Sequence, residues 1–242
     1  KDFYRWMATW ARAVRKPSDL GYSDDGFDLP ELRIHKHLVD GHVSEGYLVP
    51  VIASSLQERQ QARRESLTDR VSVIAEIANS TTDPMLIWCD YNAESEMLRR
   101  TITGAVEVKG SDTPAHKASA MIGFSDGTHR VLVTKPSIAG FGMNWQHCNM
   151  MGFAGLSDSF EQFYQAIRRC YRFGQKRPVN VHISHAETEE AVIQNIMRKQ
   201  RDTEGMMGQL VAHMNAAASG RAFTDSHYHR NEERKVPAWL QK

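Results

Sequence analysis

The chain has 242 residues, of which 41% are hydrophobic and 24% charged, the composition of an ordinary folded globular protein. Its 30 basic and 29 acidic side chains give a net charge of +1, so any surface for a polyanion must be local rather than global. The length allows one large domain or two small ones. No apolar run approaches the ~20 residues that a membrane-spanning helix needs.

The sequence begins Lys-Asp-Phe, without an initiator Met or a signal-peptide pattern, and we therefore expect a piece of a longer protein. Its 3 cysteines form no C-x-x-C pair. This odd number argues against a disulfide framework or a zinc knuckle, and it favours reduced thiols in a cytoplasmic protein.

The N-terminal part predicts a lead-in segment. A basic stretch over residues 1–16 favours a helix, and an irregular acidic stretch with Gly and Pro follows it up to Pro30. Residues 32–39 predict a strand. A long helix is expected over residues 54–79, where five apolar side chains recur at helical spacing. They are Leu67, Val71, Ile74, Ala75 and Ala78.

Further along, short apolar runs alternate with amphipathic stretches. We expect strands over residues 85–89, 106–108, 130–134, 149–153 and 179–184, and helices over residues 92–102, 113–124, 158–172 and 188–201. This alternation predicts an α/β fold, a parallel sheet flanked by helices. Ligands of such sheets bind beyond the carboxyl ends of the strands. After about Arg201 the sequence shows little pattern and is interpreted as a tail.

The expected helix over residues 158–172 carries two chemistries. Four residues fall on an apolar side; they are Phe160, Phe163, Ile167 and Cys170. Gln165, Arg169 and Arg172 fall on the other side, at spacings of four and three residues. Residues 160–180 hold five basic side chains and one acidic side chain. Arginine suits forked contacts with phosphate oxygens, although a solvated basic helix face is the simpler reading of any two arginines.

The sequence from Gln165 to Val179 favours phosphate contact over a solvated basic helix face. It matches every fixed position of Q-A-x-x-R-x-x-R-x-G-Q-x-x-P-V, and so resembles the last signature motif of superfamily-two helicases of the Swi/Snf type. Upstream, Thr134-Lys135-Pro-Ser-Ile-Ala-Gly140-Phe-Gly142-Met-Asn144 resembles the fifth motif of that family. Glycines there let backbone N–H groups approach a phosphate or a sugar. Trp145, which follows, replaces a usual Leu and is expected to pack.

Two further segments resemble motifs of the same family. Met85-Leu-Ile-Trp-Cys-Asp-Tyr91-Asn92 resembles the fourth motif, and Lys109-Gly110-Ser111 resembles the next, with a lysine in place of the usual arginine downstream. The resemblance covers about residues 84–203. A weaker likeness of residues 16–30 to the linker of phage-type members implies a bacterial or phage-encoded, cytoplasmic protein.

The resemblance implies a RecA-like (P-loop NTPase-type) domain, the second lobe of an ATP-dependent DNA helicase or translocase, with RNA not excluded. The chain has no G-x-x-x-x-G-K-[ST] and no D-E-x-H-like run, so ATP and Mg²⁺ are expected to bind mainly to a missing first lobe. Residues 1–53 would then be a lead-in or linker from that lobe, 54–203 the domain, and 204–242 a tail. The lobe alone is expected to hydrolyse no ATP.

The resemblance also implies roles for particular residues. Arg169, Arg172 and Gln165 are the expected catalytic residues, and Gly140, Gly142 and Asn144 the expected nucleotide-binding residues. The expected nucleic-acid contacts are Tyr91, Asn92, Gly110, Ser111, Thr134 and Lys135. No metal site is expected within the chain, because His35, His37, His227 and His229 lack further ligands at a suitable spacing.

Two alternatives remain open at this point. A non-catalytic nucleic-acid-binding module needs basic loops but no aligned arginines. An interaction scaffold needs none of these motifs. A hydrolase triad has no support, because the chain lacks a G-x-S-x-G elbow.

Overall fold

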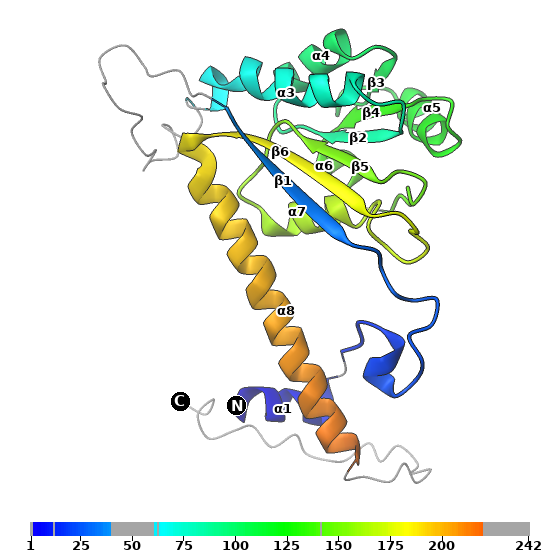
Figure 1. Cartoon of the computed structure of the whole chain (residues 1–242), viewed down its shortest axis with the longest axis vertical. Helices are drawn as coiled ribbons and strands as arrows, with labels where there is room; N and C mark the ends of the chain where they lie inside the picture. The colour runs from blue at the N-terminus through cyan, green and yellow to red at the C-terminus, as the bar shows by residue number, and fades with distance from the viewer. Residues whose placement is uncertain (1, 12, 40–60, 62, 141, 220–242) are drawn as a thin grey trace. The chain divides into compact units, whose positions relative to one another are not determined.

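The computed structural model describes residues 2–11, 13–39, 61, 63–140 and 142–219 (Figure 1). The chain divides into two compact units, one of Asp28–Arg198 and one that combines Lys1–Phe27 with Lys199–Lys242. The larger unit contains the sheet and all the residues for which we expect a function. None of the helices in the described part of the chain is long and apolar enough to cross a membrane.

The larger unit is built on a six-stranded sheet with the order β1-β6-β5-β2-β4-β3. All five strand pairings are parallel. The strands are β1 (Leu32–Val39), β2 (Met85–Trp88), β3 (Ala105–Glu107), β4 (Val131–Thr134), β5 (Met150–Phe153) and β6 (Val179–Ala186). The predicted fold class, an α/β fold with a parallel sheet flanked by helices, is confirmed.

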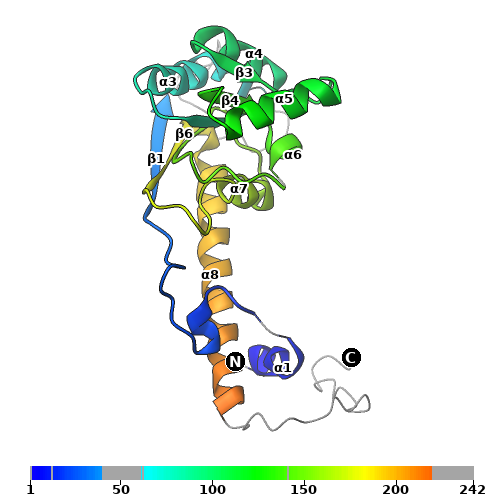
Figure 2. The same ribbon diagram turned by 90° about the vertical axis from the view of Figure 1, so that its right-hand side faces the viewer.

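Helices cover both faces of the sheet (Figure 2). One face is covered by α3 (Leu67–Asn79) and α4 (Asn92–Thr101). The other is covered by α5 (Pro114–Ser125), α7 (Phe160–Ile167) and the first turns of α8 (Glu190–Ser219). The four-residue helix α6 (Pro136–Ala139), which the sequence did not predict, follows β4.

The two cores follow from strands buried on both faces. In β2, Leu86 and Trp88 pack into the core under α5 and α7, while Met85 and Ile87 pack into the core under α3 and α4. A continuous apolar run is therefore what this central strand needs.

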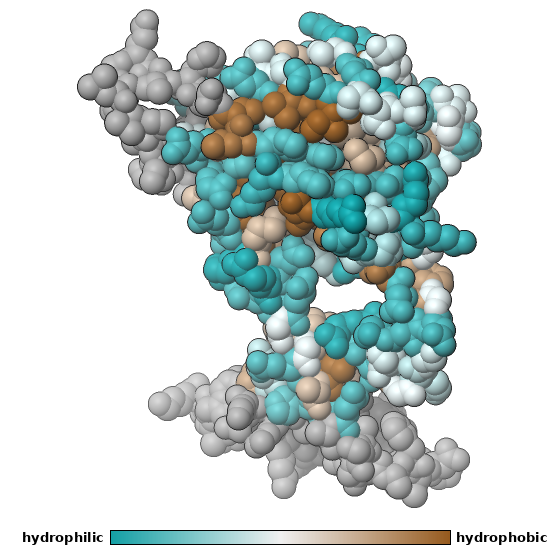
Figure 3. Space-filling view, viewed as in Figure 1, coloured by the Kyte–Doolittle hydropathy of each residue, from teal (hydrophilic) through white to brown (hydrophobic). Residues whose placement is uncertain are grey.

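At the edge of the sheet, the surface over β1 is mainly hydrophilic, and hydrophobic residues gather beside α3 (Figure 3).

Three segments differ from the sequence-based expectation. Strand β1, which we assigned to the lead-in, pairs with β6 along its whole length, so the compact unit begins before residue 54. Helix α8 continues to Ser219, well into the expected tail, because good helix formers there combine with Met207, Leu210, Val211 and Met214 at helical spacing, which pack into a small core. Residues 54–60 of the expected long helix lie outside the described residues.

The smaller unit contains α1 (Asp2–Trp10), the 3-10 helix η1 (Pro17–Leu20) and the last turns of α8. Its core is small. It consists of Ala8, Ala13, Leu210, Val211 and Met214. The Arg15 guanidinium donates to Asp19 at 2.9 and 3.1 Å, and this contact lowers the pKa of Asp19 to about 2, against the opposing effect of burial.

Candidate functional site

Two loops that resemble helicase motifs are hydrogen-bonded to each other. We name residues 168–175 the arginine turn; it faces the loop of residues 142–148. The backbone N–H of Trp145 donates to the Arg169 carbonyl at 2.8 Å. The side-chain amide of Gln175 donates to the carbonyls of Gln146 and Cys148, both at 2.9 Å. The two loops therefore form one structural element near the amino ends of β5 and β6, the strands that follow them.

Arg169 is buried and makes three hydrogen bonds. Its Nη1 donates to the Met143 carbonyl at 2.9 Å, and its Nε and Nη2 donate to the carbonyl and side-chain oxygens of Gln165 at 3.0 and 3.4 Å. Arg172 is partly exposed, and its Nη1 donates to Oδ1 of Asn144. The structure therefore brings together Gln165, Arg169, Arg172 and Asn144.

Neither of these two guanidiniums has an acidic partner in the part of the chain that the structure describes. Among the described residues, no carboxylate lies within ion-pair distance of Arg169 or Arg172. Burial and the neighbouring charge of Arg172 both lower the pKa of Arg169. Two adjacent positive charges without a counter-charge attract an anion, and guanidiniums match the geometry of phosphate oxygens.

The predicted helix over residues 158–172 is wrong in its length, because α7 ends at Ile167. The Trp145 N–H takes the Arg169 carbonyl, and the Gln175 amide donates to the carbonyls of Cys148 and Cys170, at 2.9 and 3.4 Å. These contacts from outside the helix compete with continued helical hydrogen bonding. Arg169 and Arg172 therefore lie in a turn, and not along one helix face with Gln165.

The glycines of the fifth motif have backbone roles. A Cβ on Gly140 would lie 2.1 Å from the Pro136 carbonyl oxygen, to which the Gly140 N–H donates at 2.8 Å. Gly142 has φ +83°, a left-handed conformation that side chains rarely adopt. Gly140 closes α6, and Gly142 leads into the loop that holds the arginine turn. Both glycines therefore shape the site indirectly.

The expected nucleic-acid contacts follow three neighbouring strands. Asn92 follows β2, Ser111 follows β3 and Lys135 follows β4, and in the sheet β2, β4 and β3 are adjacent. Asn92 and Ser111 are exposed, and Lys135 is partly exposed. Gly110, also exposed, accepts a hydrogen bond from Lys117 at 2.6 Å through its carbonyl. Because the three strands are parallel, these residues lie beyond the carboxyl ends of the strands, at the same edge of the sheet.

Thr134 does not share this exposure. Its side chain is fully buried, and its hydroxyl donates to the Val108 carbonyl at 3.2 Å. The hydroxyl therefore joins β4 to the end of β3 instead of facing solvent. Tyr91 is partly exposed, and its backbone N–H donates to Oε2 of Glu94 at 3.0 Å. Trp145 packs, as expected: it is fully buried, and its ring nitrogen donates to Ser125 at 2.9 Å.

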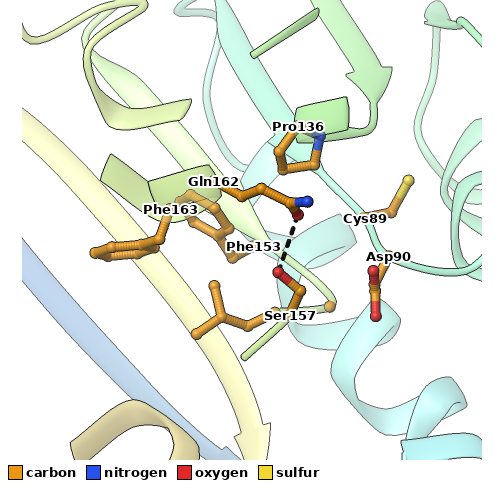
Figure 4. A pocket seen from close by; sticks show the side chains of 9 residues that line it. Cys89, Asp90, Pro136, Phe153, Ser157, Gln162 and Phe163 are labelled. Atoms are coloured by element: carbon orange, nitrogen blue, oxygen red, sulfur yellow. Dashed lines mark hydrogen bonds between the residues drawn. The ribbon is translucent and has the colours of Figure 1, made fainter. Parts of the chain in front are cut away.

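A small pocket opens between the ends of β2 and β5 and the starts of α6 and α7 (Figure 4). Its polar lining consists of Asp90, Ser157 and Gln162, and the Ser157 hydroxyl donates to Oε1 of Gln162 at 3.0 Å. Cys89 also lines it, and burial raises the pKa of that thiol. Asp90 lies within the segment that resembles the fourth motif, whereas Ser157 and Gln162 belong to no motif quoted above. The signal that could have indicated Asp90 and Ser157 is their place shortly after the strands predicted over residues 85–89 and 149–153.

Three histidines, His35 and His37 of β1 and His182 of β6, lie together, although no sequence pattern links them. The rings of His35 and His182 stack with centroids 4.7 Å apart, and His37 Nε2 lies 3.0 Å from His182 Nδ1. Burial and these two neighbours lower the pKa of His182 to about 4. Within the described part of the chain, no group of three or more His, Cys, Asp or Glu side chains could hold a metal ion.

Comparison with known proteins supports the resemblance for part of the chain. Residues 68–174, somewhat less than half of it, match the family described as helicase conserved C-terminal domain. Such domains occur in ATP-dependent nucleic-acid helicases. The match covers β2 to β5, α7 and most of the arginine turn. No curated protein sequence matches the chain.

The solved structures that are similar to the chain include the following three helicase-related proteins. The RNA helicase Prp28 from Chaetomium thermophilum, bound to ADP, is 12% identical with a TM-score of 0.52 and aligns over 72% of this chain and 37% of its own. The C-terminal domain of the DEAD-box protein Dbp5 is 14% identical with a TM-score of 0.49, and the alignment covers 72% of this chain and 86% of that domain's chain. The C-terminal part of the Fun30 ATPase domain is 17% identical with a TM-score of 0.47, and the alignment covers 52% of this chain and 45% of the Fun30 chain. The chain thus spans less than half the length of the Prp28 and Fun30 chains. At such identities the likeness shows the fold alone.

Proposed function

We propose that the chain is the second motor lobe of an ATP-dependent DNA helicase or translocase of the Swi/Snf type. The observation that supports this most is the pair of guanidiniums, Arg169 and Arg172, that have no carboxylate partner within the described residues. In the proposed enzyme a preceding lobe supplies the P-loop and holds ATP and Mg²⁺. The arginine turn faces the triphosphate across the cleft between the lobes.

Each residue near the arginine turn has a physical task in this proposal. Arg172 and Arg169 stabilise the negative charge that develops during phosphoryl transfer to water, an effect worth ~10³–10⁵ in rate. Gln165 orients Arg169 through its two oxygens, 3.0 and 3.4 Å away. Asn144 fixes Arg172 through its side-chain oxygen. Gly140 and Gly142 set the backbone path of the loop that carries Asn144.

The carboxyl edge of the sheet is proposed to hold the nucleic-acid backbone. Asn92, Ser111 and Lys135 place an amide, a hydroxyl and an ammonium group on neighbouring loops. Such groups bind phosphate and sugar and read no bases, which suits a motor that steps along any sequence. The buried hydroxyl of Thr134 supports these loops from beneath. A bacterial or phage-encoded cytoplasmic enzyme is part of the same proposal.

The division of labour between lobes is the first test. Phosphate release is measured for the 242-residue chain and for the full-length protein, with and without single-stranded or duplex DNA and with RNA of the same sequence. We expect no turnover by the chain, and turnover by the full-length protein that DNA stimulates. Turnover by the chain alone, or a full-length protein without ATPase activity, would favour a binding module or a scaffold instead.

The nucleic-acid surface is tested by salt dependence. Lys135→Ala removes one cation and is expected to reduce the slope of log affinity against log salt by about one unit. Ser111→Ala should weaken binding to unrelated DNA sequences equally. Thr134→Val is the matched control, since it removes a buried hydroxyl and should change stability but not the salt slope. A change of sequence preference in Ser111→Ala or Lys135→Ala would mean that these loops read bases.

A further inference from the structure

A fully buried ion pair joins α3 and α4 beneath the carboxyl edge. The side chains of Arg70 and Glu94 are 1% and 0% exposed, and Arg70 Nη1 lies 2.8 Å from Glu94 Oε1. Neither residue belongs to a motif discussed above. Burying two charges costs free energy that the pair recovers only when further hydrogen bonds satisfy both groups.

Arg70 meets this condition through three backbone or side-chain acceptors. Its Nε donates to the Ser66 hydroxyl at 3.0 Å, its Nη2 to the Arg63 carbonyl at 2.6 Å, and its Nη1 to the Ala154 carbonyl. Ala154 comes directly after β5. The guanidinium therefore ties the start of α3 to the end of a central strand.

Glu94 uses its second oxygen to hold a loop. Oε2 accepts the backbone N–H groups of Asp90 and Tyr91 at 2.8 and 3.0 Å. A Cβ on Gly155 would lie 2.2 Å from the same oxygen, so only a glycine leaves room for the carboxylate. Burial raises the pKa of Glu94, while Arg70 and the two N–H groups oppose that rise.

A second buried arginine neutralises the surroundings of this pair. Arg63 lies 3.2 Å from Glu189, and 3.5 Å from both Asp90 and Asp158. Burial lowers the pKa of Arg63, but these carboxylates raise it more. The loop after β2 is thus held from below by Glu94 and from the side by Arg63.

Buried ion pairs stabilise a fold no better than apolar side chains of similar volume. Here the pair does something that apolar side chains cannot do, because methyl groups accept no hydrogen bond from Asp90 and Tyr91. Its distinctive effect is one fixed backbone geometry for residues 89–92. Tyr91 and Asn92, two of the expected nucleic-acid contacts, lie in this segment.

We propose that Arg70 and Glu94 are positioning residues that fix the loop of residues 89–92 for contact with a nucleic-acid backbone. The fixed loop follows from the contacts above, whereas its use for nucleic acid rests on the proposed function. Glu94 holds the loop, and Arg70 holds the charge of Glu94 in place.

Two double variants separate positioning from stability. Arg70→Met/Glu94→Met and Arg70→Met/Glu94→Gln both remove the two charges at similar volume, but only the Gln variant keeps an oxygen that accepts the N–H groups of Asp90 and Tyr91. Arg130→Met is the matched control, because Arg130 also donates to backbone carbonyls, those of Ala78 and Thr81, at the amino edge of the sheet. Each is made in the 242-residue chain.

The first readout is amide hydrogen exchange at Asp90 and Tyr91, followed by NMR. In Arg70→Met/Glu94→Met we expect exchange about tenfold faster or more at both amides, with Ile87 in β2 unchanged. In Arg70→Met/Glu94→Gln and in Arg130→Met both amides should stay protected. Equal exchange in the two double variants, or protection in both, would overturn the positioning role.

The second readout is the affinity for a single-stranded DNA oligonucleotide, measured by fluorescence anisotropy. We expect a loss of about fivefold or more in the Met/Met variant and near-normal affinity in the other two. If the wild-type chain binds no oligonucleotide, the proposed function fails at this surface while the exchange experiment still decides the positioning. Should the double variants not fold, Glu94→Asp keeps the charge, withdraws the acceptor and is expected to expose the same two amides.

Discussion

Two pairs of arginines in the same compact unit are held in opposite ways. Arg63 and Arg70 lie among carboxylates, with Glu189 near both and Glu94 at 2.8 Å from Arg70. In the described structure Arg169 and Arg172 contact only carbonyl and amide oxygens. Carboxylates of the fold balance the positive charges of the first pair, whereas no described carboxylate balances those of the second pair.

This difference in charge balance separates the two pairs of arginines, whereas burial does not. Arg169 is 8% exposed and Arg63 is also 8% exposed, so exposure alone would group them together. The charge balance separates them: an arginine with its own carboxylate is satisfied, and one without is available to an anion. The comparison can be tested by removing arginines from each pair and comparing what is lost.

The largest loss of stability is expected from Arg70→Met. It leaves the buried Glu94 without its counter-charge, and breaking a buried pair from one side costs about 3–5 kcal/mol. Urea unfolding followed by tryptophan fluorescence gives the free energy of unfolding. A cost below about 1 kcal/mol would mean that solvent or another cation compensates Glu94, and the two arginine pairs would no longer differ as described.

A smaller loss is expected from Arg169→Met. It leaves acceptors of Met143 and Gln165 without a donor, but no buried charge loses its partner. Unsatisfied buried acceptors cost about 1–3 kcal/mol. The same unfolding experiment applies, and a loss equal to that of Arg70→Met would contradict the distinction. It would imply a carboxylate partner for Arg169 outside the described residues.

A third region becomes charged only in acid. His182 has its pKa lowered from 6.5 to about 4, by burial first and then by His35 and His37. As the pH falls, His182 therefore binds a proton near pH 6.5 in the unfolded chain, but only near pH 4 in the folded chain. Stability is complete above pH 6.5 and falls between pH 6.5 and 4, by about 1 kcal/mol after allowance for partial exposure.

His182→Gln should remove this part of the pH dependence. Thermal midpoints of both proteins from pH 7.5 to 4 measure the effect, and the two curves should converge towards low pH. Parallel curves would show that His182 is protonated alike in the folded and unfolded chains.

Much of the fold could be predicted because its signals are local. The alternation of apolar strands and amphipathic helices predicted the parallel sheet, and the stripe from Leu67 to Ala78 predicted α3. Phe163, Ile167 and Cys170 are buried as their spacing indicated. Helix α8 was underestimated because the helical spacing of Met207, Leu210, Val211 and Met214 in its last turns was not recognised, although these side chains pack into the small core.

The finer features of the site depend on contacts between distant segments. The end of α7 is set by Trp145 and Gln175, which compete for carbonyls of the arginine turn. The burial of Thr134 depends on the Val108 carbonyl of a neighbouring strand. Arg70 and Glu94 meet only after α3 and α4 pack side by side. No local pattern in the sequence reveals such pairings.

The central claim is that Arg169 and Arg172, which have no carboxylate partner among the described residues, act on phosphate. Arg172→Ala removes a partly exposed guanidinium and should change the stability of the chain by less than ~0.5 kcal/mol. Arg172→Lys is the companion variant, because an ammonium keeps the charge but not the forked geometry. The thermal midpoint and the DNA affinity of both variants are measured beside those of the wild type, so that a loss of catalysis can be separated from a loss of folding or binding.

The decisive measurement is the DNA-stimulated ATPase rate of the full-length protein carrying Arg172→Ala. We predict a fall of ~10³-fold or more in turnover, little rescue by Arg172→Lys, and nearly unchanged DNA binding. Near-normal turnover in a folded Arg172→Ala protein, or a loss of activity that only follows unfolding, would contradict the account.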